Sequence, residues 1–600
     1  MVRASGGMSF SDSAADEWAA GRGIPVPFDP KAIFSDAAAD SWAADRGIAA
    51  QRTRHIRSRA AAALIAVPGD VPRIVLYGRD AEADAPPAIL RRAIDATEQA
   101  LTTALTTADG AKWVFDERQR WERAWFGATD YAGIGQALNN ALYRIQPKAA
   151  DSQAVGGAKI VPGDGGDLRL GPGVWMIDEP IVMPSQTGLV GAGCSSTVLK
   201  KSATWPAGAT LLSHRGGAPT NTSEGVSGRY HKNHNRIQHL TLHGNDKTGL
   251  VLDSSYSSVA RYDDLLLYAC PQTAWLLEET WDSRFYGVDL GWCGGTAGIA
   301  DAAMRITSSA YDMSNLLRFY GMRHETFRSC AIAIEKGPNG GSLAPYLIEF
   351  DGLKLESNVM PDNAVQFYSS PDTNTISIRD AYLNLRGTVP RTGLRGIDLD
   401  GQGHIVDGLM ASVGDNASVI SIVRAPRGQR GGTIRNVRAG VGGTGAALQM
   451  TVEVDNLKAS GNPAVYDHKA MIIDEIRETP GIPMVGSTTA DGLKKSRARI
   501  RQLEGMPVTV KTGTDTIWWN EMNRIIPFNH ATAAANFVID LNLGYIGDVI
   551  TVSQEGAAAA TLVPWTGVTL QVPSGLSATT AGQYTQVRAR KIAANTWRVF

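Results

Sequence analysis

A seven-residue pattern that recurs nine times between about residues 235 and 460 constrains the fold of this chain more than any other feature. Its second position is apolar or aromatic and its fifth and seventh positions are mostly apolar, which is typical of a strand with one buried face. Successive copies begin 20 to 34 residues apart. The copies span residues 236–242, 261–267, 284–290, 318–324, 349–355, 377–383, 405–411, 433–439 and 453–459.

The fourth position of the pattern carries residues that tolerate a left-handed backbone. It is glycine in four copies, aspartate or asparagine in four, and histidine in one. Other residues would be strained there by roughly 1–2 kcal/mol. Each copy therefore predicts a strand, a left-handed kink and a second strand. Repetition at this spacing predicts a solenoid in which every coil is buried against its neighbours.

Composition narrows the class of protein. A chain of 600 residues is expected to hold several domains. Its 64 glycines and 20% charged residues favour a β-rich protein. The net charge of −1 gives no general attraction to nucleic acid or membranes. The N-terminus lacks a signal-peptide core and no run is long enough to span a bilayer, so we expect a soluble protein that is not exported by the usual route.

The four cysteines suit a chain that folds in a reducing compartment. Cys270 and Cys293 each lie five residues after a fifth position, so they are expected to stack in adjacent coils. Buried thiols are favoured over a disulfide or a metal site, because neither a CxxC motif nor clustered histidines accompany them. The sequence predicts no metal and no cofactor.

The N-terminal part of the chain contains a second repeat, in which residues 11–24 return as residues 35–48. Each copy begins with Ser-Asp, continues through alanine-rich helix formers and ends at a glycine, which predicts a short capped helix. The two copies either pack one tryptophan each or form a duplicated docking peptide that presents Trp18 and Trp42 to a partner.

Residues 87–109 read as a further helix with a heptad seam, which serves either as a short oligomeric stalk or as a helix packed on its own domain.

Three segments near residue 130 carry a family resemblance. An amphipathic stretch at 131–145 precedes Gly-Gly and a short strand with Pro-Gly-Val-Trp at 165–177, and a Val-Gly-Ala-Gly turn lies within 188–199. Together they resemble the first segment of pectate-lyase-like right-handed parallel β-helix proteins, which include tailed-bacteriophage tailspikes. The resemblance covers about residues 130–460. It implies the fold but not the chemistry, because lyases, hydrolases and inactive adhesins share this segment.

Residues 506–600 read as a run of short strands that ends in a tryptophan-bearing edge. They are similar to the small β-sandwich that closes many phage tail-fibre and tailspike chains. The expected fold is mainly β: a right-handed parallel β-helix with a small α-rich N-terminal region and a C-terminal antiparallel β-sandwich. The expected divisions are an attachment segment at 1–60, a helical or mixed neck at 61–128, the β-helix at 129–480, a linker at 481–505 and the sandwich at 506–600.

The resemblance also implies a biological setting. It implies a homotrimeric virion protein that folds in the host cytoplasm, attaches to a phage tail or baseplate protein through its N-terminal region, and meets host-surface polysaccharide with its β-helix. No nucleic-acid partner and no membrane insertion are expected.

Residues at equal positions in a solenoid lie on neighbouring coils about 4.8 Å apart, so columns of side chains can be read from the sequence. The outward first position reads Arg236, Arg261, Arg284, Arg318 and then Glu349. Stacked guanidinium groups need anions between them. These come either from ion pairs, for which Asp263 and Asp351 are candidates in the next outward column, or from an anionic polysaccharide. In the second case Arg284, Arg318 and Asp351 bind the substrate.

The outward position after each copy places Glu325 and Glu356 on consecutive coils. Carboxyl groups about 5 Å apart fit a retaining glycosidase, and their mutual repulsion is expected to raise one pKa so that this group can act as the acid. Trp292 and Tyr320 are candidate sugar-stacking residues. The alternative is a pair of solvated glutamates at loop starts. The reserve acids are Asp282, Asp289, Asp351 and Asp362, and no aspartate cluster matches the calcium site of the pectate lyases.

Three functions are compatible with these patterns. The chain is either a tailspike that depolymerises polysaccharide, a non-catalytic adhesin or structural fibre, or a bacterial polysaccharide lyase. The missing signal peptide weighs against the third. The sequence lacks a motif that separates the first two.

Overall fold

The computed structural model describes most of the chain from residue 53 onwards. The described residues are 53–81, 83, 85–126, 133–146, 165–214, 232–310, 312–337, 343–425, 432–454, 472–476, 485–486, 499–500, 510–517, 521–541, 543–544 and 546–600. The predicted positions of Trp18 and Trp42 and most of the predicted linker at 481–505 lie outside these residues. The chain forms two compact units, one of Met1–Ala100 with Ala104–Asp116 and one of Leu101–Thr103 with Glu117–Phe600.

Where it is described, from residue 53 onwards, the first unit is a small sheet with two short helices. The five strands pair in the order β1-β2-β3-β5-β4, and the two helices are only four or five residues long. The bounds are β1 Thr53–Ile56, α3 Arg59–Ala63, β2 Arg73–Leu76, β3 Ala88–Arg92, α4 Ala96–Gln99, β4 Leu105–Thr106 and β5 Lys112–Phe115.

The prediction of one helix over residues 87–109 is wrong. Leu90 and Leu101 of the supposed seam are buried, but Ile94 is 67% exposed, so the apolar spacing does not mark one face. Arg91 instead turns back onto the buried carboxylate of Glu98, with nitrogen–oxygen distances of 2.9 and 2.7 Å. The tertiary sheet, rather than local helix propensity, decides this segment.

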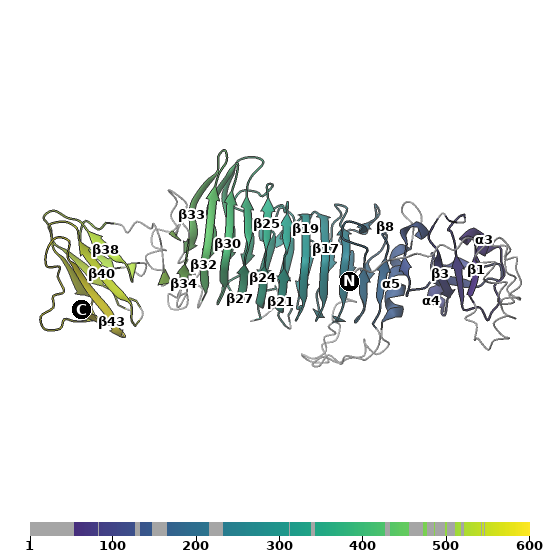
Figure 1. Ribbon diagram of the computed structural model, residues 1–600, viewed down its shortest axis with the longest axis horizontal. Helices are drawn as coiled ribbons and strands as arrows, with labels where there is room; N and C mark the ends of the chain where they lie inside the picture. Colours follow the sequence, from purple (N-terminus) through teal and green to yellow (C-terminus); the bar gives the residue numbers. More distant parts are fainter. Residues whose placement is uncertain are drawn as a thin grey trace, which may run out of the picture. The chain divides into compact units, whose positions relative to one another are not determined.

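The second unit is dominated by a parallel β-helix, which confirms the expected fold. One long sheet runs along it, and every strand pairing in this sheet is parallel (Figure 1). Its strands are β6 Arg120–Trp121, β7 Asp167–Leu170, β8 Gly173–Ile177, β10 Gly188–Val190, β11 Thr197–Lys201, β14 Arg236–His243, β17 Arg261–Cys270, β19 Arg284–Cys293, β21 Asn315–Tyr320, β22 Arg323–Glu325, β24 Tyr346–Asp351, β25 Lys354–Ser357, β27 Asn374–Arg379, β28 Tyr382–Leu385, β30 Ile405–Val413, β32 Thr433–Val441, β34 Ile472–Asp474 and β36 Arg499–Ile500.

A second parallel sheet closes the described coils. Because the long sheet is bent along its length, each such coil has three sides, two from the long sheet and one from the second sheet. Its strands follow those of the long sheet in the chain and pair only with one another. They are β9 Ile181–Val182, β12 Leu212–Ser213, β15 Leu252–Asp253, β18 Trp275–Glu278, β20 Met304–Thr307, β23 Ile332–Glu335, β26 Val365–Ser369, β29 Arg391–Leu399, β31 Ala417–Ala425, β33 Ala447–Val454 and β35 Val485–Gly486.

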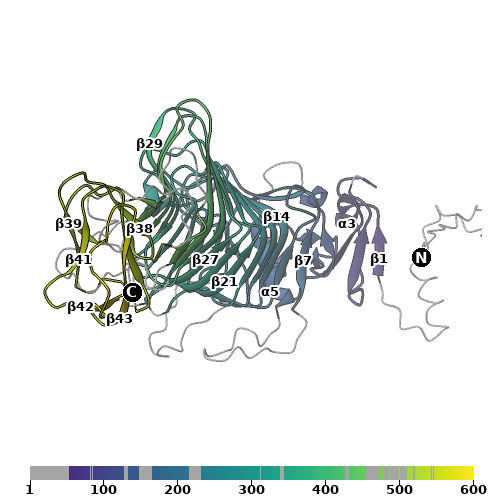
Figure 2. The same cartoon turned by 60° about the vertical axis from the view of Figure 1, so that its left-hand side comes forward.

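The predicted kink divides each coil of the long sheet into two legs. We call positions one to three of the repeat the first leg and positions five to eight the second leg. In the first eight copies the fourth residue has a positive φ between 48° and 76°. The predicted register of these eight copies is also confirmed, because their first residues pair in one continuous series from Arg236 to Thr433. Figure 2 shows β14, β21 and β27 of this series in the same sheet.

A second left-handed column lies two residues before each of the first seven copies and was not predicted. Its members have φ between 48° and 66°, and they include Val259 and Thr375, whose branched side chains disfavour this backbone. The backbone N–H of Val259 donates to Trp281 O at 3.0 Å, and that of Thr375 donates to Gln402 O at 2.8 Å. Hydrogen bonds to the next coil therefore hold a conformation that these residue types do not reveal. The column consists of His234, Val259, Asp282, Leu316, Leu347, Thr375 and Gly403.

An aromatic stack fills the middle of the β-helix at the second repeat position. Tyr262, Phe285, Phe319 and Phe350 lie ring on ring, with successive centroids 4.8, 4.1 and 4.7 Å apart. Trp275 of the second sheet meets the stack edge-on. All five side chains are buried, so they stabilise both the register and the closure of the coil.

The two cysteines predicted to stack do so. Cys270 and Cys293 are partners on neighbouring strands, and both are buried free thiols. Burial raises the pKa of the Cys270 thiol. This environment keeps the thiol protonated.

The prediction of a ninth copy of the repeat in the long sheet is wrong. Its first two residues, Glu453 and Val454, end β33 of the second sheet, and Val452 pairs there with Val485. The strand that follows β32 in the long sheet is β34, where Ile472 pairs with Thr433. The spacing of 20 residues at this copy is the shortest in the series and leaves too little chain for a full coil.

The predicted amphipathic helix before the coils is present as α5, Ile134–Ile145. Both carboxylate oxygens of Asp178 accept from its N-terminal amides, at 2.5 Å from Gly133 and 3.0 Å from Gly135. A negative charge at this end stabilises the helix. Its apolar face, which includes Leu138 and Leu142, is buried.

The C-terminal part forms two sheets over one core, with mixed rather than antiparallel pairing. The sheet β37-β39-β41 is parallel, whereas β38-β40-β43-β44-β42 combines parallel and antiparallel pairs. Side chains from both sheets, among them Phe528, Phe537 and Trp597, share one cluster. The bounds are β37 Asp515–Ile517, β38 Ile525–Phe528, β39 Ala535–Ile539, β40 Val549–Gln554, β41 Ala560–Pro564, β42 Thr569–Gln571, β43 Gln586–Ala593 and β44 Thr596–Val599.

Among the described residues, no helix combines the length and apolar character that crossing a membrane requires.

His324 is predicted to weaken the β-helix in acid. It is fully buried in a column where its neighbours are Leu290 and Leu355, and neither ring nitrogen has a partner among the residues that the structure describes. Burial lowers its pKa to about 3, so the unfolded chain binds the proton more tightly and stability is lost as the pH falls below about 6.5. We expect His324→Leu to stabilise the protein by about 2 kcal/mol at neutral pH, and by about 2 kcal/mol more at pH 5.

Urea unfolding at pH 7.5 and pH 5 measures both effects. The matched control is His404→Leu, since His404 is equally buried but its Nε2 contacts Asp400 O at 2.8 Å and its Nδ1 accepts from Ile376 N at 3.1 Å. This control is expected to destabilise. A destabilised His324→Leu protein would show that the imidazole has a partner.

Gly321 provides a test of the kink column. Its φ is 65° and a Cβ there would meet nothing within 4 Å, so only the backbone conformation opposes substitution. We expect Gly321→Ala to lower the free energy of unfolding by about 1–2 kcal/mol. Gly321→Asn should lose less than half of that, because Asn436 occupies the same column with φ 54°. Equal losses for the two variants in urea unfolding would mean that the kink does not control stability.

Candidate functional site

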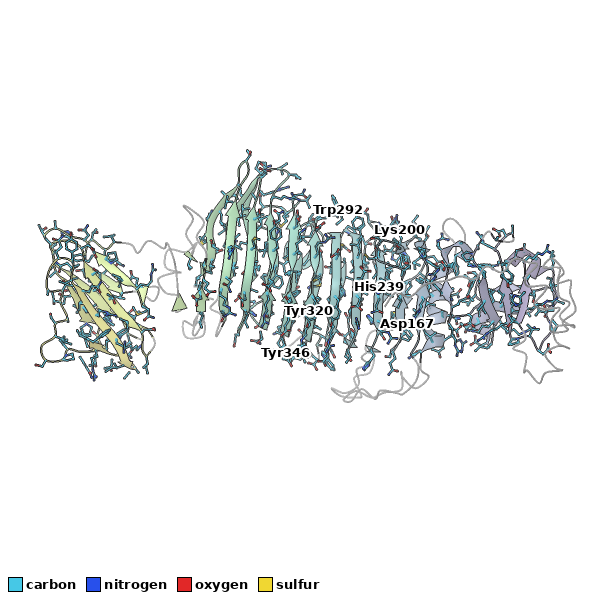
Figure 3. The ribbon with its side chains drawn as sticks, viewed as in Figure 1. Asp167, Lys200, His239, Trp292, Tyr320 and Tyr346 are labelled. Atoms are coloured by element: carbon cyan, nitrogen blue, oxygen red, sulfur yellow. The ribbon has the colours of Figure 1, made fainter. Side chains whose placement is uncertain are left out.

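The outward side chains of the long sheet form two surfaces that the kink column separates. The first-leg surface carries positions one and three of the repeat, and the second-leg surface carries positions six and eight. In Figure 3, Tyr320 and Tyr346 lie towards the lower edge of the sheet and Trp292 at its upper edge, with His239 of the kink column between them. The residues predicted to bind one substrate are therefore divided between two surfaces.

On the first-leg surface, the arginine column is largely balanced by ion pairs within the chain. Arg236 lies 2.8 Å from Asp167, Arg261 lies 2.7 Å from Asp263, and Arg318 lies 3.2 Å from Glu349. The ion-pair interpretation thus holds for three of the four arginines. No ion pair within 4 Å is found for Arg284 in the described part of the chain.

A pocket of about 360 Å³ opens among these arginines, and we call it the arginine pocket. It spans three successive coils, and each contributes an arginine and a residue of the second left-handed column. That column turns the backbone immediately before each arginine, so it forms the wall of the pocket. The lining residues are Val259, Ala260, Arg261, Asp282, Arg284, Leu316 and Arg318.

Two stacked tyrosines lie beside the arginine pocket in the third-position column. The rings of Tyr286 and Tyr320 are 5.1 Å apart and nearly parallel, at 11°. Both side chains are half-buried. The guanidinium of Arg261 lies 5.4 Å from the Tyr286 ring, and Asp351 is the next member of the column after Tyr320. The pocket is thus bordered by an aromatic platform with donors and acceptors around it.

On the second-leg surface, six side chains of alternating charge form a continuous chain of ion pairs, which we call the charge ladder. It consists of Asp289, Arg323, Glu325, Lys354, Glu356 and Arg386, and successive nitrogen–oxygen distances are 2.8, 3.4, 3.1, 3.0 and 2.7 Å. Glu325 and Glu356 do pair on adjacent strands, as predicted. Lys354 lies between the two carboxylates and bridges them, which the sequence pattern did not predict.

The bridging lysine changes the electrostatics that were expected for the pair. Burial acts to raise the pKa of Glu356, but Lys354 and Arg386 more than offset it and the pKa is lowered. Within the ladder, burial raises the pKa of the Asp289 carboxyl group, while Arg323 acts in the opposite direction. Asp289 and Glu356 therefore differ in proton affinity although they belong to one ladder.

Trp292 lies near the start of the charge ladder, at the end of β19. Its side chain is 46% exposed and its backbone is left-handed, with φ 54°. Trp292 therefore belongs with Glu325 and Glu356 rather than with Tyr320. The described residues contain no cluster of three or more histidine, cysteine, aspartate or glutamate side chains that could hold a metal ion.

Comparison with known proteins finds similar structures but no similar sequences. No family model matches the chain, and no curated protein sequence matches it significantly. The structural neighbours include phage tailspike proteins and a glycan-modifying enzyme with a parallel β-helix fold.

Three neighbours illustrate this likeness. A Geobacillus virus E2 protein is 15% identical, with 66% of this chain and 72% of that chain covered and a TM-score of 0.42. The enzymatically active domain of bacteriophage CBA120 tailspike protein 2 is 12% identical, with 80% and 67% covered and a TM-score of 0.39. The A-module of an Azotobacter vinelandii mannuronan C-5 epimerase is 13% identical, with 64% and 100% covered and a TM-score of 0.32. At these TM-scores the likeness does not assign a function to this chain.

The bridging role of Lys354 can be tested through the pH dependence of stability. Lys354→Met leaves Glu325 and Glu356 on adjacent strands without the cation between them. We expect a loss of about 0.5–1 kcal/mol at pH 7, since the group is partly exposed to solvent. The lowered pKa of Glu356 stabilises the folded chain above about pH 4.5, and this contribution disappears as the pH falls through the lowered value.

Urea unfolding of both proteins should therefore give a smaller difference at pH 3 than at pH 7. Lys354→Arg, which keeps the charge, is the control and should unfold like the unaltered protein. An equal loss at both pH values would contradict an electrostatic role.

Proposed function

We propose that this chain is a tailspike-type protein that binds surface polysaccharide along the first-leg surface. The observation that carries the proposal is the stacked Tyr286–Tyr320 pair beside the arginine pocket. Half-buried aromatic rings give a sugar ring an apolar face to pack on. The size of the pocket lies within the usual range for small-ligand sites.

The repeat of the fold supports a polymeric rather than a small ligand. Equivalent side chains recur on successive coils, about 4.8 Å apart, so the first-leg surface offers similar groups along its length. Arg284 has no ion pair among the described residues and can donate to hydroxyl or carboxylate oxygens of the ligand. Asp282 supplies an acceptor in the same pocket, and Asp351 supplies another two coils further on. Arg318 contributes through its half-exposed guanidinium.

Depolymerisation is the second candidate, and the charge ladder favours it. A glycosidase needs one carboxyl group that holds a proton and one that is ionised. Burial raises the pKa of Asp289, and the cations around Glu356 lower its pKa. Asp289 is therefore added to the predicted pair Glu325 and Glu356 as the acid. Trp292 would stack on the sugar next to it.

The assembly proposed here follows the sequence resemblance. The chain is a homotrimer in the virion tail, and its N-terminal region, with Trp18 and Trp42, attaches to a tail or baseplate protein. These parts remain predictions.

Binding is tested by titrating the full chain with purified bacterial capsular polysaccharides and lipopolysaccharides in a calorimeter. We expect Tyr320→Ala to weaken binding of the recognised polymer about tenfold, because the platform loses one ring. Tyr382→Ala is the matched control, since Tyr382 is a half-buried outward tyrosine of the second leg. Equal losses for the two variants, or no binding of any polymer, would refute the first-leg surface.

Depolymerisation is tested on the polymer that binds, by following its size, new reducing ends and unsaturated-uronate absorbance together. Shorter polymer with reducing ends alone means hydrolysis, and Asp289→Asn, Glu325→Gln and Glu356→Gln should then each lower the rate at least a hundredfold. Added absorbance means a lyase. Bound but intact polymer means an adhesin and eliminates the catalytic role of the ladder.

A further inference from the structure

The outer face of the C-terminal five-stranded sheet carries three neighbouring arginines. Along β43 the side chains alternate, so that Val587 and Ala589 enter the core while Arg588 and Arg590 are exposed. Arg598 of β44 is exposed as well and is the register partner of Arg590. The three guanidinium groups therefore lie on one face of two adjacent strands.

An aromatic ring completes this face. Phe600 is 45% exposed, and its ring centroid lies 4.8 Å from the guanidinium carbon of Arg588 and 5.2 Å from that of Arg590. The N–H of Phe600 donates to Arg588 O at 3.1 Å, which fixes the ring beside β43. We call Arg588, Arg590, Arg598 and Phe600 the arginine–phenylalanine face.

The charges of this face are not neutralised within the described residues. None of the three arginines has a carboxylate within 4 Å there, and Arg598 donates only to the neutral oxygen of Gln571, at 3.1 and 3.0 Å. Lys511 of the same C-terminal part, by contrast, is neutralised, because it lies 2.6 Å from Asp515 and 2.8 Å from Glu521. The arginine–phenylalanine face thus presents three cations with free donors.

We propose that the arginine–phenylalanine face is a second glycan-binding site, distinct from the first-leg surface, and that its ligand is an acidic polysaccharide. Guanidinium forks bind carboxylates with two parallel hydrogen bonds, and the ring accepts the apolar face of a sugar. Uronate-containing polymers combine both groups in each repeat. Charge complementarity therefore selects the acidic class.

Two other occupants fit the face less well. A symmetric contact with a second copy would bring like charges together, which opposes association. Nucleic-acid binding typically uses more phosphate contacts than three arginines can make, and the net charge of −1 gives no general attraction to it.

The test uses the full-length chain carrying Tyr320→Ala, so that the first-leg surface contributes little. Polygalacturonate and neutral dextran are titrated at low salt into this protein and into one that also carries Arg588→Gln and Arg590→Gln. We expect the dissociation constant for polygalacturonate to rise at least tenfold in the second protein, and dextran to bind neither. The matched control replaces Arg57 and Arg118, two exposed arginines outside the repeat copies, by glutamine and should change the constant less than twofold.

Further variants and ligands test the role of the guanidinium groups and the two other occupants. Arg588→Lys with Arg590→Lys should recover part of the binding, because it keeps the charge without the planar fork. Binding of polygalacturonate that is unchanged by the glutamine variants would overturn the proposal. So would tighter binding of a thymidine 20-mer than of polygalacturonate, or a change in oligomeric state in light scattering without a change in binding. Each comparison is made between proteins that share the Tyr320→Ala background, so a difference between them reports on the arginine–phenylalanine face and not on the first-leg surface.

Discussion

The structure depends on the exact alignment of one coil with the next, because side chains alternate along each strand and a slip of one residue would turn every buried group outwards. Two features fix that alignment. The aromatic stack from Tyr262 to Phe350 holds equivalent residues ring on ring in the middle of the β-helix. The left-handed kink then turns each coil at the same residue, so both legs keep their register.

This alignment also organises the surface. Equivalent residues on successive coils become neighbouring side chains. When these side chains carry like charges, their repulsion must be relieved by opposite charges of the protein or by a ligand. The charge ladder shows the first solution, in which Asp289, Arg323, Glu325, Lys354, Glu356 and Arg386 alternate in sign. The arginine pocket combines both, since Arg261 and Arg318 have carboxylate partners and Arg284 has none among the described residues. Arg284 is therefore the member of the arginine pocket that is proposed to donate to a glycan.

Only part of the charge ladder follows from the columns of equivalent residues. The adjacency of Glu325 and Glu356 follows from the register alone. The cation between them does not, because Lys354 occupies a different column and reaches both carboxylates with a long flexible side chain. The separation of Trp292 from Tyr320 was missed for a related reason. Both were assigned to one substrate from their sequence proximity, although the kink at Gly287 and Gly321 places the two legs on different surfaces.

The sequence by itself determined the β-helix, its register over eight coils and the kink column, because these are repeated and each copy reinforces the others. It also determined the stacking of Cys270 on Cys293. Only the tertiary structure decided the second left-handed column, where hydrogen bonds between coils impose a backbone that Val259 and Thr375 do not favour alone. It likewise decided that the segment around Ile94 belongs to a sheet unit and that Glu453 belongs to the second sheet. Local propensity and spacing are weak there, and pairing with distant strands contributes the larger free energy.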